Sequence, residues 1–149
     1  MIYWLFMKTE GVILMLSTPN VGWSRITIGE WSDRCSYLDD VPFMLLEAIE
    51  ESCRINKPVS VKLDAKGWED IIIFDQFETH IILNLTGTFI YYSVDIDRDE
   101  LAKELTSDIR RDIDGWCKWF CYQDLTEDYI SERKKDLLAL CDIVEKRIN

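Results

Sequence analysis

Histidine, proline and glycine are scarce in this sequence, which has one, three and six of them among 149 residues. Because histidine is the usual general base near neutral pH, a single His80 leaves little material for acid–base catalysis or zinc binding. No known local signature ties His80 to a serine or cysteine nucleophile, and we expect it to be a surface or packing residue. The scattered glycines form neither a GxGxxG nor a Walker pattern. We therefore expect no catalytic residues, no metal site and no cofactor.

Basic residues are also in the minority, with 17 lysines and arginines against 28 acidic residues and a net charge of -11. An acidic surface repels the phosphates of nucleic acids and anionic membranes, so neither is an expected partner. The same charge is compatible with solubility alone or with a basic protein partner.

Long apolar runs are absent, because no stretch approaches the about 20 residues of a membrane span. The N-terminal run MIYWLFM stops at Lys8 after seven residues, which is too short for a secretory signal. Met7 is a second candidate for the natural start. We expect a cytoplasmic protein.

Cysteine is present in an odd number and at irregular spacing, unlike the dense pattern of disulfide scaffolds. The five residues are Cys35, Cys53, Cys117, Cys121 and Cys141. Cys117 and Cys121 are four apart, but a structural zinc site needs four nitrogen or sulfur ligands. We interpret all five as buried thiols in a reducing compartment.

The stretch DDVPFMLLEAI predicts the start of a helix at Pro42, which suits the first helical turn. Asp39 and Asp40 precede it, where free backbone N–H groups and the positive end of the helix dipole attract acids. Apolar side chains then recur at helical spacing. They are Phe43, Leu46, Ile49 and Cys53, with Leu45 beside them.

Several short segments before and after this helix alternate or are wholly apolar, which is typical of β-strands. The expected strands are 11–17, 23–37 with a bulge at Gly29, 59–63, 71–74, 81–85 and 89–94. The run Ile71–Phe74 is apolar throughout, which favours a central strand. Short strands at this spacing indicate an antiparallel meander of about five to six strands.

Two helices are expected after the strands. Asp97 and Glu100 resemble a capping box, and the long helix that follows has an apolar residue at every fourth position as far as Cys117. A second box at Asp124–Glu127 precedes a terminal helix. We predict a single α+β domain over residues 1–149, with one early helix and two C-terminal helices packed on one face of the sheet.

The aromatic cluster WCKWFCY, residues 116–122, has two interpretations that stay open here. It is either a helix end buried against the sheet or an exposed aromatic anchor for a partner, since Trp and Tyr are favoured at binding hot spots.

Acidic clusters do not form a recognisable site. Residues 95–99 alternate acids as a calcium loop does, but Glu100 and Thr106 occupy the places where an EF-hand needs Gly and Glu. Asp39 with Asp40, and Asp75 with Glu78, are candidate acid–base pairs by residue type alone.

The segment SYLDDVPFMLLEAI, residues 36–49, resembles a group of small bacterial proteins that carry a Ser-Tyr-Leu-x-Asp-x-Pro stretch after an early strand, followed by an apolar helix. Proteins of this group are regarded as immunity proteins, antitoxins that block a toxin delivered by a neighbouring cell. The resemblance implies a protein that needs no chemistry but does need a surface complementary to its toxin.

Our working hypothesis is a non-enzymatic inhibitor that binds a basic toxin domain, because opposite charge raises the association rate and specificity. The expected partner-binding residues are Asp33, Asp39, Asp40, Asp95, Asp97 and Asp99. Two alternatives remain open: a regulatory or self-assembling module such as a homodimer, and an enzyme with an unrecognised site.

Overall fold

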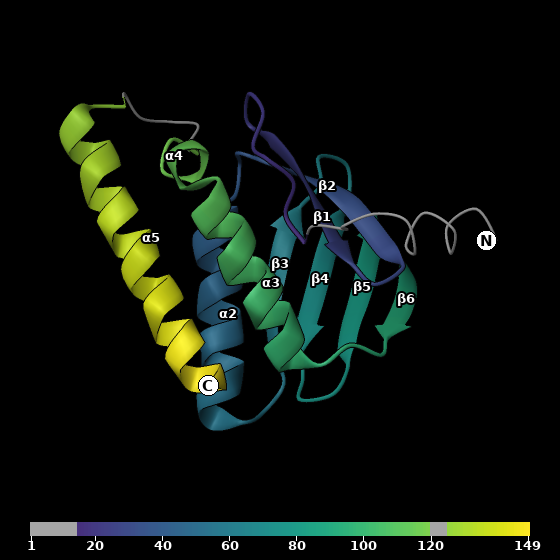
Figure 1. Ribbon diagram of the computed structural model, residues 1–149. Helices are drawn as coiled ribbons and strands as arrows, with labels where there is room; N and C mark the ends of the chain where they lie inside the picture. Colours follow the sequence, from purple (N-terminus) through teal and green to yellow (C-terminus); the bar gives the residue numbers. More distant parts are fainter. Residues whose placement is uncertain (1–14, 120–124) are drawn as a thin grey trace, which may run out of the picture.

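A computed structural model of the chain describes residues 15–119 and 125–149. The described elements are a β-hairpin, a helix, four strands and three further helices in that order (Figure 1). Their bounds are β1 Trp23–Ile28, β2 Trp31–Ser36, α2 Val41–Ile55, β3 Val59–Asp64, β4 Glu69–Phe74, β5 Thr79–Leu85, β6 Thr88–Val94, α3 Arg98–Arg111, α4 Ile113–Trp116 and α5 Glu127–Ile148. The α+β class is confirmed. None of the helices in these two ranges is long and apolar enough to cross a membrane.

The strands form two antiparallel sheets, whereas the sequence predicted a single meander. β1 pairs with β2, and the second sheet has the order β3-β4-β5-β6, which confirms that β4 is internal. Gly29 has a φ of 57° and lies in the two-residue turn of the hairpin, so the predicted bulge is wrong. Asp39, just after β2, accepts the backbone N–H of Asp64 at the outer edge of β3 through its Oδ2. Of the predicted strand 11–17, the described part contributes an isolated bridge from Leu16 to Ile26.

The hairpin and the helices cover the same side of the four-stranded sheet (Figure 1). We call this covered side the inner face and the opposite side the outer face. Along β3, Val61 and Leu63 point inward and are buried, while Lys62 and Asp64 point outward and are exposed. α2 packs against β3 and β4 on this face, whereas α5 packs mainly on α2 and α3, so the predicted packing of both C-terminal helices on the sheet is confirmed only in part.

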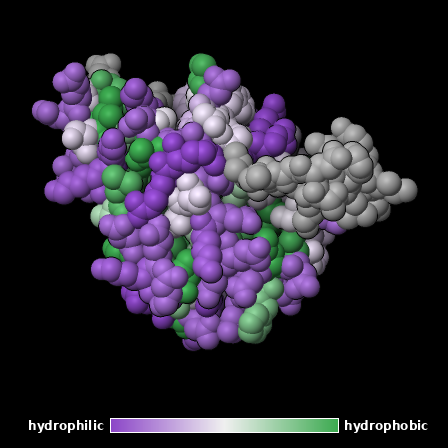
Figure 2. All heavy atoms as spheres, in the orientation of Figure 1, coloured by the Kyte–Doolittle hydropathy of each residue, from purple (hydrophilic) through white to green (hydrophobic). Residues whose placement is uncertain are grey.

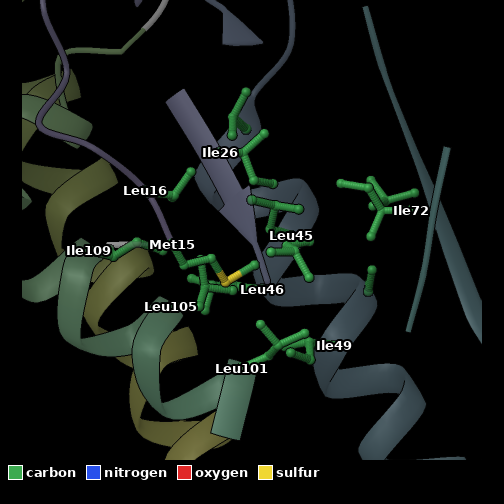
Figure 3. Close-up of a cluster of buried hydrophobic side chains, with 14 of the residues drawn as sticks. Met15, Leu16, Ile26, Leu45, Leu46, Ile49, Ile72, Leu101, Leu105 and Ile109 are labelled. Carbon is green, nitrogen blue, oxygen red and sulfur yellow. The ribbon is translucent and has the colours of Figure 1, made fainter. Parts of the chain in front are cut away.

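The core lies between the inner face, the hairpin and the helices. Figure 3 shows side chains from the segment before β1, from β1, from α2, from α3 and from β4 pointing toward one another. The labelled residues are all fully buried: Met15, Leu16, Ile26, Leu45, Leu46, Ile49, Ile72, Leu101, Leu105 and Ile109. The apolar stripes predicted for α2 and α3 supply much of this core.

The predicted start of α2 is confirmed. Asp40 is the N-cap residue and Pro42 lies in the first turn, where its missing N–H leaves no intrahelical bond unmade. At the other end, Asn56 adopts the left-handed conformation with a φ of 52°, which stops the helix before Pro58.

The long helix predicted from Arg98 to Cys117 is wrong, because α3 ends at Arg111 and is followed by the short α4. Asp108 Oδ2 accepts the N–H of Leu16, and Asp112 Oδ2 accepts the hydroxyl of Thr18. These bonds hold the segment before β1 against the end of α3. We attribute the break to this docking and to the weak helix propensity of the sequence Asp-Ile-Asp-Gly that follows Arg111.

The start of the terminal helix is also displaced. α5 begins after Thr126, whose hydroxyl accepts the N–H of Tyr129 at 3.2 Å. The predicted first residue of its capping box, Asp124, lies outside the described residues.

The described part of the aromatic cluster is buried, in agreement with the first of its two interpretations. Trp116, Cys117 and Trp119 are at most 2% exposed, and Trp119 Nε1 donates to the carbonyl of Asp39 at 2.9 Å. Phe120, Cys121 and Tyr122 lie outside the described residues.

The other cysteines are free thiols. Cys35 and Cys141 are buried, and burial raises their pKa values to about 12 and about 11. These thiols therefore stay protonated and unreactive at neutral pH, as expected of core cysteines. Cys53 differs from the prediction, since it is only half-buried.

Candidate functional site

The outer face of the four-stranded sheet carries an apolar centre that no described helix or strand covers (Figure 1). Strand pairing places Ile71, Ile82 and Tyr91 in one row across β4, β5 and β6. The isoleucines are half-buried, while Tyr91 is 59% exposed. We define the outer-face patch as Ile71, Ile73, Ile82, Phe89 and Tyr91. The opposite side of the molecule, with the hairpin and helices, is mostly hydrophilic (Figure 2).

Polar contacts border one end of this patch. Lys62 Nζ lies 3.2 Å from Glu69 Oε2, and Asn84 Nδ2 donates to Glu69 Oε1 at 3.3 Å. A surface hollow of about 300 Å³ adjoins this end and includes Glu69 and Asn84 in its lining. An apolar centre with a polar rim is the usual composition of a protein-binding surface.

The single histidine borders the other end. His80 Nδ1 and the Tyr91 hydroxyl share a hydrogen bond of 2.5 Å, and their rings are stacked with centroids 5.8 Å apart. Glu78 accepts a hydrogen bond from the Ser93 hydroxyl and lies 4.0 Å from His80 Nε2. These contacts orient Tyr91 on the sheet.

The predicted acidic residues fall into two groups at opposite ends of the helical layer. Asp39 and Asp40 are half-buried just before α2 and Asp33 is half-buried in β2, whereas the exposed Asp95, Asp97 and Asp99 follow β6, the last of them in the first turn of α3. In Figure 1 the start of α2 lies at the top of the helical layer and the start of α3 lies at the bottom. The six residues therefore do not form one continuous surface.

Asp40 and Asp39 both make contacts within the fold. Asp40 receives a two-pronged hydrogen bond from Arg133, a residue of α5 that is only 6% exposed. Asp39 accepts the N–H of Asp64 at 2.6 Å, and burial raises the pKa of its carboxyl. Charge reversal at either position would remove contacts that hold α2, β3 and α5 together. These two residues cannot serve as simple probes of binding.

Asp33 belongs to a pair of carboxyl groups between the hairpin and the sheet. It accepts a hydrogen bond from Trp68 Nε1 at 2.9 Å and lies beside Asp70 of β4, which is 1% exposed. Burial, together with Asp33, raises the pKa of Asp70 to about 8. Burial and the neighbouring acid thus both favour the protonated form of Asp70.

Asp95, Asp97 and Asp99 are the exposed members of the predicted set, and they directly follow β6. Asp97 is the N-cap of α3, because its Oδ1 accepts the N–H of Asp99 at 2.7 Å. The capping role predicted for Asp97 is confirmed. The carboxylates of Asp95 and Asp99 add negative charge next to the C-terminal end of the edge strand.

A third surface, at the open end of the hairpin, combines aromatic and cationic side chains. Lys66 Nζ lies 4.7 Å from the ring centre of Trp23 and 5.0 Å from that of Tyr37. Arg34 lies within 5.8 Å of the rings of Trp23 and Trp68. These cation–π contacts join the β3–β4 turn to the hairpin. We interpret them as structural contacts between the two sheets.

The candidate acid–base pairs do not converge on a reacting centre. Asp75 accepts the N–H of its neighbour Gln76, and Glu78 has its contacts at Ser93 and His80. Within residues 15–119 and 125–149, no group of three or more His, Cys, Asp or Glu side chains is arranged to hold a metal ion.

The patch was missed by sequence reasoning, although two signals for it were present. In the runs Ile71–Phe74 and Phe89–Tyr92, apolar residues occupy both alternating sets of strand positions, so some of them must point away from the helices.

No protein-family model, curated protein or solved structure matches the chain.

Proposed function

We propose that this chain is a non-enzymatic protein-binding module and acts as an immunity protein. In this proposal it neutralises a basic toxin domain in the cytoplasm by direct one-to-one binding. The observation that carries the proposal is the outer-face patch, an apolar area with a polar rim on a rigid sheet in a chain of net charge -11.

The composition of the patch supports a protein partner. Phe89 and Tyr91 are 63% and 59% exposed, and aromatic side chains are enriched at the centres of protein interfaces. The strands beneath them are held by continuous backbone pairing from β3 to β6. A preorganised surface loses little conformational freedom on binding.

The charge of the chain supports a basic partner. Asp95 and Asp99 are exposed beside the end of β6, and the chain has 28 acidic residues against 17 basic ones. Opposite charges accelerate encounter and disfavour acidic competitors. Nuclease toxins that bind phosphate are often basic, which suits them as partners of an acidic inhibitor.

The test is calorimetric titration of the purified chain with basic toxin domains encoded next to its own gene, followed by growth rescue on co-expression. We expect a one-to-one complex whose affinity falls as salt is raised. Replacement of Ile71 and Ile82 by threonine should weaken binding about 100-fold, because it removes the apolar centre. Ile143→Thr, an exposed isoleucine of α5, is the matched control.

A second pair of variants tests charge alone. Asp95→Asn with Asp99→Asn should slow association and flatten the salt dependence, while Glu132→Gln with Asp136→Asn changes the net charge equally on α5. Equal effects from both pairs would show that these acidic residues act only through long-range attraction to the partner, without direct contact. Full affinity in the Ile71/Ile82 variant, with its fold intact by circular dichroism, would refute the outer-face patch as the binding surface.

A further inference from the structure

β6 is an edge strand without the features that usually prevent edge-to-edge pairing. Its seven residues, TFIYYSV, contain no charge, no proline and no glycine. It ends the strand order β3-β4-β5-β6, so half of its backbone N–H and C=O groups point away from the sheet. Six of its seven residues are exposed, and only Val94 is half-buried.

The opposite edge of the same sheet is protected. β3 carries Lys62 and Asp64 as exposed charges, and the N–H of Asp64 is already bonded to Asp39. Charged side chains and occupied backbone groups are the usual means by which proteins block an edge. The contrast shows that this fold can protect an edge, and that no strand among residues 15–119 and 125–149 pairs with the free edge of β6.

From this contrast we infer that β6 pairs with β6 of a second copy of the chain, in antiparallel orientation and centred on Tyr91. The pairing joins the two four-stranded sheets into one continuous sheet. It does not depend on the proposed function, because it uses the edge and leaves most of the outer-face patch open.

The register follows from the length of the strand. With Tyr91 on the two-fold axis, Thr88 faces Val94 of the second copy, so all seven residues of each strand are paired. Ile90 then faces Tyr92 of the second copy. These two inward-pointing residues are 39% and 41% exposed in the single chain, and aromatic–aliphatic pairs of this kind stabilise antiparallel strands.

The distribution of charge favours a second copy over an unrelated partner. Two acidic chains approach most readily through an uncharged surface, and β6 itself has no charged side chain, although the Glu78 carboxylate lies against Ser93 near its end. Asp95 lies four residues beyond Tyr91, roughly 13 Å along a strand. The aspartates of the two copies are then about 26 Å apart, well beyond the screening length of about 8 Å in physiological salt.

The experiment is analytical ultracentrifugation of the full chain and of two variants, Tyr91→Lys and Tyr91→Asp. We expect the wild type to dimerise, and to do so more strongly as salt screens the repulsion between acidic copies. A dimer of either variant alone has like charges opposite each other at the two-fold axis. Its dissociation constant should therefore be about tenfold higher than that of the wild type. A mixture of the two variants puts a lysine opposite an aspartate at the axis, and it should recover a heterodimer.

Phe77→Lys and Phe77→Asp are the controls, since Phe77 is similarly exposed in the turn between β4 and β5. A wild type that is monomeric up to about 0.1 mM would overturn the inference. A dimer that both Tyr91 variants preserve would overturn it as well, and a mixture that stays monomeric would refute the register. The salt dependence separates this result from the toxin complex, because salt should strengthen the dimer and weaken that complex.

Discussion

Three consecutive isoleucines in β4 occupy two different environments. Ile72 points to the inner face and is fully buried, whereas Ile71 and Ile73 point to the outer face and remain partly accessible. The residues share one side-chain type, one strand and one set of backbone pairings. Their difference comes only from which face the hairpin and helices cover, so the sheet has a side that holds the fold together and a side that is free to bind.

The test of this difference with the largest expected effect is a pair of substitutions in β4. Ile72→Ala should lower the free energy of unfolding by about 2–5 kcal/mol, because it leaves a cavity in the core. Ile71→Ala should lower it by less than about 1 kcal/mol, since that side chain keeps contact with water in the folded state. Urea denaturation of both variants provides the measurement. Equal losses would show that the outer face is covered as fully as the inner face.

The next test concerns the one acidic residue of β4 that points to the inner face. Asp70 has a pKa of about 8 in the fold, above its ordinary value of 3.8, because of burial first and then of Asp33. The folded state therefore binds more protons than the unfolded chain between about pH 4 and pH 8. The free energy of unfolding should fall as the pH rises through this range, by up to about 1.4 kcal/mol per pH unit from this residue.

The carboxyl groups of Asp33 and Asp39 and the Cys35 thiol lie near this site. Asp39 acts in the same direction, because burial raises its pKa too. Asp70→Asn removes the main titrating group while keeping its size. Urea unfolding at pH 5 and at pH 8 should then show a much smaller difference than in the wild type, and an unchanged difference would assign the effect to another group.

The smallest expected effect is on the outer face. Lys62 and Glu69 are 63% and 40% exposed, and exposed ion pairs contribute little because water already stabilises both charges. Lys62→Met should change the free energy of unfolding by less than about 0.5 kcal/mol, as measured by urea denaturation at low and high salt. A loss of about 2 kcal/mol or more would contradict the description of this face as open to solvent.

Local patterns predicted the parts of the fold that local interactions determine. The start of α2 follows from Pro42, although the Asp40 side chain makes no cap hydrogen bond there, and the apolar stripes of α2 and α3 identify their buried faces. The break after Arg111 was only partly predictable, because the weak helix propensity of Asp-Ile-Asp-Gly is local but the bond that Leu16 donates to Asp108 spans 92 residues of the sequence. The contact of Asp39 with the edge of β3 likewise joins residues that are 25 apart in the sequence.

The candidate site was harder to predict than the fold. Charge density alone cannot distinguish Asp40, whose carboxylate is paired with Arg133 at a separation of 93 residues, from Asp95, which is exposed. The outer-face patch was equally hidden. An apolar run shows that a strand has two apolar sides, but not which side the helices leave open.

The strand order β3-β4-β5-β6 also has a consequence for how the chain folds. Each strand pairs with its neighbour in sequence, so the sheet assembles by closing short loops with a small loss of chain entropy. The contact of Arg98 with Ser52 spans 46 residues and can form only when α2 and α3, which flank the sheet in sequence, meet on its inner face. We expect the four strands to form early and the helical layer to consolidate in the rate-limiting step, so that substitutions of Arg98 slow folding more than substitutions in the β5–β6 turn.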